Sequence, residues 1–189
     1  MSARTRRFIP RLEALDDRSL PSVSVTQTES TVVVDVNDDA ANKVQILDNG
    51  LLDNGIIIVV DGVSYTTTGL VTAITVNTYG GDDQVDYILG GPAFASRNIY
   101  VDLGRGDDSF NAYMSGWDLQ SGAQISISAY GRGGADTFAL YAEYLGTQAN
   151  SQLLVDFEGG AGKDRISFDY IPGDVQDGTV TLQANLQHH

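Results

Sequence analysis

The stretch GGAGKDRIS, residues 159–167, decides how this chain folds, because its spacing recurs three times upstream. Each copy contains Gly-x-Asp-x-apolar, and the four aspartates are 25, 28 and 28 residues apart. The copies are Gly81-x-Asp83-x-Val85, Gly106-x-Asp108-x-Phe110, Gly134-x-Asp136-x-Phe138 and Gly162-x-Asp164-x-Ile166. A glycine-rich corner repeated at a nearly constant interval is typical of repeat architectures. Residues 37–45, NDDAANKVQ, resemble a fifth, eroded corner with Asn42 in the aspartate's place.

The segments on both sides of each corner alternate apolar with small or polar residues, which is the pattern of β-strands. They are residues 74–79, 99–103, 125–130 and 153–158 before the corners, and 84–89, 109–114, 137–145 and 165–171 after them. Equivalent positions are mostly apolar in all four copies, so copies stacked in parallel would share one continuous core. We therefore predict an all-β fold, a parallel β-helix or β-roll-like solenoid of about four coils over residues 74–189. An antiparallel sandwich is the alternative, since it needs strands of similar length.

Residues 23–73 fit the repeat less well and contain several short strand-like segments. We predict that they form an antiparallel β cap, because an open solenoid end exposes strand edges that invite aggregation. Within them, LDNGLLDNG at 47–55 doubles the Asn-Gly turn signal and predicts a tight hairpin. The segment 177–186, DGTVTLQANL, is expected to cover the other end. Residues 1–22 form a separate basic leader.

The charge distribution limits the partners of this protein. The formal net charge is −14, and five of the 11 basic residues lie within the first 22 positions. An acidic body of this kind repels nucleic acid and anionic membrane surfaces, and divalent cations are its natural counter-ions. No apolar run is long enough to cross a membrane. The chain has no cysteine, so it has neither disulfides nor thiolate zinc sites.

The corners resemble the nonapeptide Gly-Gly-x-Gly-x-Asp-x-apolar-x of haemolysin-type (RTX) proteins. GGAGKDRIS matches every specified position, and GRGGADTFA at 131–139 lacks one glycine. LGRGDDSFN at 103–111 and TYGGDDQVD at 78–86 keep Gly-x-Asp-x-apolar. The resemblance covers roughly residues 74–171 and implies a secreted protein that binds Ca²⁺ at its corners. The metal-site residues that it implies are Asp83, Asp108, Asp136, Asp164, Asp82, Asp107, Gly81, Gly106, Gly134, Gly160 and Gly162.

The chain also departs from that family. Haemolysin-type repeats follow one another every nine residues, whereas the corners here recur once per coil. Four basic residues lie in or beside the corners and could replace Ca²⁺ as charge partners, namely Arg105, Arg132, Lys163 and Arg165. Two interpretations of the corners therefore stay open: Ca²⁺ sites, or Asp-Gly turns whose aspartates bond only to backbone amides.

The leader carries a second resemblance. FIPRLEALDDRSLPS, residues 8–22, looks like the Pro-Arg-Leu-Glu-x-Leu-Glu-Asp-Arg-x-x-Pro-Ser segment of exported bacterial surface proteins, with Asp16 where Glu is usual. The resemblance implies sorting or attachment at the bacterial surface. A disordered basic tail is the alternative.

Little in the sequence favours catalysis. The only histidines are the last two residues, so the usual general bases and nucleophile partners are missing. Adjacent aspartates such as Asp82 and Asp83 suit metal or solvent better than a glycosidase site. We expect a non-enzymatic, secreted or cell-surface bacterial module, structural or adhesive, with Ca²⁺ as its cofactor. The alternative is a carbohydrate-binding module or part of a polysaccharide-active protein, in which Trp117 and other loop aromatics contact a cell-surface polymer or glycan.

Overall fold

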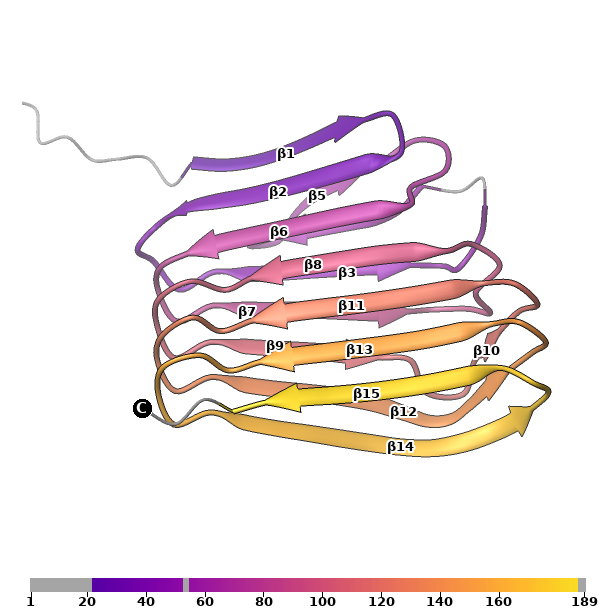
Figure 1. Cartoon of the computed structure of the whole chain (residues 1–189). Coiled ribbons are helices and arrows are strands. Elements are labelled where there is room, and N and C mark those ends of the chain that lie inside the picture. The colour runs from indigo at the N-terminus through magenta and orange to yellow at the C-terminus, as the bar shows by residue number, and fades with distance from the viewer. Residues whose placement is uncertain (1–21, 53–54, 187–189) are drawn as a thin grey trace, which may run out of the picture.

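The computed structural model describes residues 22–52 and 55–186 and contains only strands, turns and loops in that part of the chain. The strands form a β-solenoid in which the chain crosses from one sheet to a second sheet at stacked corners, four of which are glycine-rich (Figure 1). The predicted solenoid is confirmed, and the antiparallel sandwich is wrong, because the repeated strands pair in parallel. The leader resemblance lies outside the described residues.

The first sheet contains the strands that precede the corners. In spatial order they are β1 (Ser22–Thr28), β2 (Thr31–Asp38), β6 (Ala73–Tyr79), β8 (Arg97–Asp102), β11 (Gln124–Tyr130), β13 (Gln152–Glu158) and β15 (Thr179–Asn185). The second sheet contains the strands that follow the corners, together with three further short strands. In spatial order they are β10 (Asp118–Leu119), β12 (Thr137–Thr147), β9 (Ser109–Tyr113), β7 (Gln84–Leu89), β3 (Lys43–Asp48), β4 (Ile57–Val60) and β5 (Val63–Thr66), with β14 (Arg165–Val175) also paired to β12.

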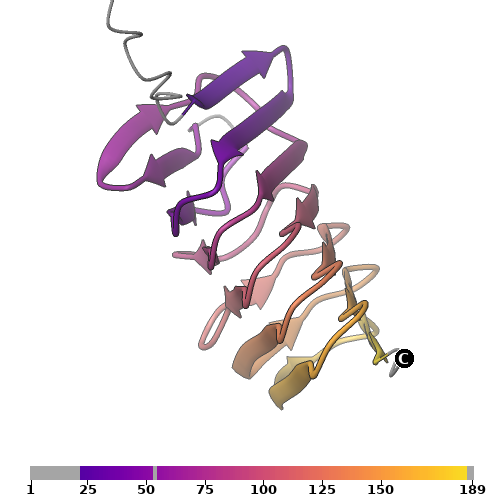
Figure 2. The same cartoon turned by 90° about the vertical axis from the view of Figure 1, so that its left-hand side faces the viewer.

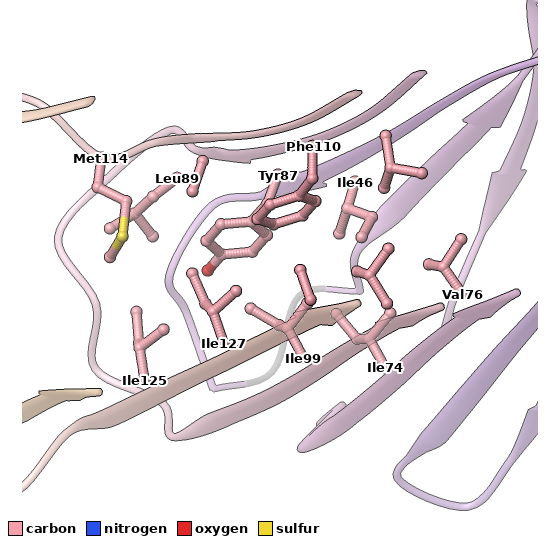
Figure 3. Close-up of a cluster of buried hydrophobic side chains, with 14 of the residues drawn as sticks. Ile46, Ile74, Val76, Tyr87, Leu89, Ile99, Phe110, Met114, Ile125 and Ile127 are labelled. Atoms are coloured by element: carbon pink, nitrogen blue, oxygen red, sulfur yellow. The ribbon is translucent and has the colours of Figure 1, made fainter. Parts of the chain in front are cut away.

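The core lies between the two sheets and consists of stacked columns of apolar side chains. In the first sheet, Ile74, Ile99, Ile127 and Val155 occupy paired positions of β6, β8, β11 and β13. In the second, the column is Val85, Phe110, Phe138 and Ile166. Parallel strands in register place each residue about 4.8 Å from its equivalent, so the period-two pattern keeps every column on the same face. Figure 3 shows side chains of the two sheets meeting in this interior.

The solenoid begins earlier than the sequence predicts. β2 pairs with β6 and β3 pairs with β7, both in parallel, so residues 31–48 are already the first coil rather than part of an antiparallel cap. The cap consists of β1, antiparallel to β2, and the β4–β5 hairpin beside β3. β3 and β4 are antiparallel neighbours, but residues 49–56 connect them, so the tight Asn-Gly hairpin is wrong.

The C-terminal end also differs from the prediction. β15 pairs in parallel with β13 and adds another strand to the first sheet instead of folding over the end. The inward residues of the last strands are therefore only half-buried, as Ile166, Phe168, Val180 and Leu182 show. Among the described residues, no further coil covers this end of the core, whereas each earlier coil is covered by the next one.

Candidate functional site

The corners lie one above another along a single edge of the solenoid, which faces the viewer in Figure 2. The glycine two residues before each aspartate has a positive φ, from 107° at Gly81 to 152° at Gly162. A Cβ at Gly106, Gly134 or Gly162 would overlap the carbonyl oxygen of the equivalent glycine in the preceding coil. Glycine is required here because the backbones approach so closely.

The aspartates of successive corners form a continuous ladder of hydrogen bonds, which we call the inner ladder. The Asp83 amide donates to Asp108 Oδ1 at 2.7 Å and the Asp108 amide donates to Asp136 Oδ1 at 2.9 Å. The Asp136 amide donates in turn to Asp164 Oδ1 at 3.0 Å. The ladder begins one coil earlier, where the Asn42 amide donates to Asp83 Oδ1 at 2.9 Å. Asn42 therefore occupies the aspartate position of the eroded corner. Each carboxylate ties its own coil to the one before it.

Only one oxygen of each carboxylate is used by the inner ladder. The Oδ2 atoms of Asp83, Asp108, Asp136 and Asp164 are buried and have no hydrogen-bond partner. Burial raises the pKa of Asp108 to about 7 and that of Asp136 to about 6, and the neighbouring aspartates of the edge add to both increases. Burial also raises the pKa of Asp83. An ionised carboxylate with one unpartnered buried oxygen is destabilising unless a proton or a cation compensates it.

A second, exposed ladder runs beside the first and uses the residue just before each inner aspartate. The Asp107 amide donates to Asp82 Oδ1 at 2.9 Å, and the Ala135 amide donates to Asp107 Oδ1 at 2.8 Å. It ends there, because Ala135, the equivalent residue of the third corner, has no carboxylate to accept the Lys163 amide. These carboxylates stay in contact with water and lie along the surface of the corner edge.

The four basic residues of the corners do not neutralise the inner ladder. The described part of the chain has three ion pairs, which are Lys43–Asp86, Arg97–Asp48 and Arg132–Asp102. None of them includes an inner-ladder aspartate, so the alternative in which these cations pair with the corner aspartates is not seen among the described residues. The interpretation as amide-bonded turns describes Oδ1 correctly but leaves Oδ2 unexplained.

The donor set of the corners fits a hard cation in part. Ca²⁺ takes six to eight oxygen ligands, which carboxylates, backbone carbonyls and water can supply. Among the described residues, no group of three or more His, Cys, Asp or Glu side chains could hold a metal ion. Each gap between coils instead offers the carboxylates of two stacked aspartates. The carbonyls of Gly81, Gly106 and Gly134 also accept no hydrogen bond from other described corner residues. Gly160, with a φ of 92°, lets the backbone of the last corner adopt a positive φ.

The sequence does not reveal a buried ion pair on the opposite edge. Arg97 is 2% exposed, and its Nε donates to Asp48 Oδ2 at 2.9 Å. The Tyr87 hydroxyl donates to the same oxygen at 3.0 Å, and the Gly50 amide donates to Asp48 Oδ1 at 2.8 Å. The contacts fix the loop after β3 to the start of β8. The one sequence signal is an arginine in an otherwise uncharged connection, and it does not identify the partner.

Exposed aromatic side chains near the second sheet lie both in a loop and on its strands. Trp117 is 38% exposed just before β10. Tyr113 and Tyr141 lie on the outer face of the second sheet, where their rings stack with centroids 5.0 Å apart and planes at 5°. Rings stacked in this way cover each other's faces, and the face is the surface that a sugar needs.

Comparison with known proteins adds no family to these observations: no family model, curated protein or solved structure matches the chain. The described residues also include no helix long and apolar enough to cross a membrane. The class of protein that the structure defines is an all-β solenoid with a ladder of buried aspartates along one edge.

Proposed function

We propose that this chain is a non-enzymatic, exported structural or adhesive module of a bacterial surface, and that Ca²⁺ at the inner ladder stabilises its fold. The observation that carries the proposal is the row of buried Oδ2 atoms without partners. Ca²⁺ would supply the positive charge that these carboxylates lack, and the stacked aspartates with the Gly81, Gly106 and Gly134 carbonyls would hold it.

Linkage between binding and folding connects this site to export. A cation that binds only the folded chain stabilises it by RT ln(1 + [L]/Kd), which is about 2.7 kcal/mol at 100 times Kd. The chain would then fold fully where Ca²⁺ is abundant, as it is outside the cell. The resemblance of residues 8–22 to a bacterial export leader supports the same location.

The test is thermal unfolding followed by circular dichroism in EGTA, in millimolar Ca²⁺ and in millimolar Mg²⁺. We expect a rise in Tm that is specific to Ca²⁺. Asp136→Asn keeps an oxygen for the Asp108 amide but removes the charge next to two gaps, so it should reduce the Ca²⁺-dependent rise. Asp174→Asn is the matched control, since Asp174 is exposed and lies outside the ladder. Equal Tm values in EGTA and Ca²⁺, or equal responses of the two variants, would refute Ca²⁺ binding at the ladder.

A further inference from the structure

Two corners break the glycine pattern at a position that favours glycine. The residue four before each inner aspartate has a positive φ in all four corners, with values of 62° at Tyr79, 94° at Gly104, 71° at Arg132 and 92° at Gly160. A left-handed conformation costs an ordinary residue roughly 1–2 kcal/mol. Gly104 and Gly160 avoid that cost, whereas Tyr79 and Arg132 do not. Strain of this kind is concentrated at functional sites.

Both strained residues line the same depression on the corner edge. A cavity of about 360 Å³ is lined by Asn77, Tyr79, Asp102, Gly104, Arg105 and Arg132. A second cavity of about 560 Å³ shares Tyr79 and Arg105 with it and extends along Asn37, Asp38, Asp39 and Gly80. Because they share two residues, the two cavities adjoin, and we call them together the corner groove. Each of them lies within the size range of small-molecule sites, about 300–1,000 Å³.

Several polar groups of the corner groove are held in place before any ligand arrives. Arg132 Nη2 donates to Asp102 Oδ2 at 2.6 Å and to the Tyr100 hydroxyl at 3.3 Å, and its guanidinium lies 5.0 Å from the centre of the Tyr130 ring. The Tyr79 hydroxyl donates to Asp35 Oδ1 at 3.2 Å. Groups fixed in this way lose little conformational entropy on binding.

The composition of the groove selects the class of ligand. Arg105 and Arg132 oppose Asp38, Asp39 and Asp102, so the lining is close to neutral within a protein of net charge −14. A polyanion would be repelled by the surrounding body. Tyr79 is 50% exposed and lines the groove together with planar amide, carboxylate and guanidinium groups. A half-exposed aromatic residue beside such donors and acceptors matches the apolar face and hydroxyls of a sugar.

We propose that the corner groove binds a neutral oligosaccharide, with Tyr79 contacting a sugar face and Arg105, Arg132, Asp102 and Asn77 contacting its hydroxyls. The proposed contacts do not include the inner-ladder aspartates, so this proposal does not rest on Ca²⁺ binding there. It moves the candidate glycan contact from the loop aromatics to strained corner residues.

The test is an array of tri- to hexasaccharides of glucose, xylose, mannose and N-acetylglucosamine, with oligogalacturonate as the acidic probe and a hydrophobic peptide pool as the protein probe. Binders are quantified by titration calorimetry on the full chain. Tyr79→Gly should weaken binding at least tenfold without lowering Tm, because glycine relieves the strained φ. Tyr144→Gly is the matched control, since Tyr144 is 65% exposed, has a φ of 58° and lies outside the groove.

Binding of a neutral oligosaccharide that is lost in Tyr79→Gly and kept in Tyr144→Gly supports the proposal. The proposal is overturned if no neutral oligosaccharide binds, if only oligogalacturonate or peptides bind, or if both variants bind like the native chain. Circular dichroism of each variant separates loss of binding from loss of fold. The outcome of the Ca²⁺ experiment at the inner ladder does not decide whether the corner groove binds an oligosaccharide.

Discussion

Replacing the central carboxylate of the inner ladder should stabilise the protein when no cation is present. Asp108→Asn keeps an oxygen to accept the Asp83 amide and removes the charge from a site that is 2% exposed. The pKa of Asp108 rises from 3.8 to about 7 on folding. At about 1.36 kcal/mol per pKa unit, an increase of this size lowers the free energy of unfolding at pH 7 by about 4 kcal/mol.

The asparagine recovers part of that free energy. Its Nδ2 takes the place of an oxygen without a partner, and an unpaired buried donor costs about 1–3 kcal/mol. We therefore expect Asp108→Asn to raise the free energy of unfolding by about 1–3 kcal/mol in EGTA at pH 7. In millimolar Ca²⁺ the order should reverse, because the native chain keeps the carboxylate that the cation needs.

The assay is urea unfolding followed by circular dichroism from pH 4 to pH 8. A folded pKa above the unfolded value means that the folded chain holds the proton more tightly. Without Ca²⁺, the native chain should therefore lose stability as the pH rises from about 4 to about 7, and Asp108→Asn should flatten this slope. A variant that is destabilised equally at pH 4 and pH 7 would refute the assignment of a penalised buried charge.

Two further substitutions test the packing of the coils, both by urea unfolding. Gly134→Ala should cost more than about 3 kcal/mol or prevent folding, because the added Cβ overlaps the Gly106 carbonyl oxygen. Gly122 also has a positive φ, 78°, but open space around it, so Gly122→Ala should cost only about 1 kcal/mol. Equal losses of stability in the two variants would contradict the close-approach explanation. Arg97→Met leaves the buried Asp48 without its cationic partner and should cost about 3–5 kcal/mol, with partial recovery on adding Asp48→Asn. No recovery would show that Arg97 acts through packing alone.

The corner aspartates and the strands beside them could be predicted because both repeat along the chain. Ile74, Ile99, Ile127 and Val155 each stand nine residues before an inner aspartate, and the structure places all four in one buried column. The start of the solenoid could not be predicted in the same way. Val32, Val34 and Val36 recur with period two as in the later strands, but asparagine replaces the aspartate in their corner, so the sequence pattern places β2 in the cap.

By itself, the sequence determined the period, the inward face of each repeated strand and the glycines that corners require, because these depend on neighbours within a few residues. Only the tertiary structure decided which charges are buried and what they contact. Arg97 meets Asp48 across 49 residues, and Asp83 receives the Asn42 amide across 41. It also brought Tyr79, Arg105 and Arg132 to one groove. The stacking of one coil on the next sets the solvation and the partners of each side chain, and the spacing of residues along the sequence does not show how the coils stack.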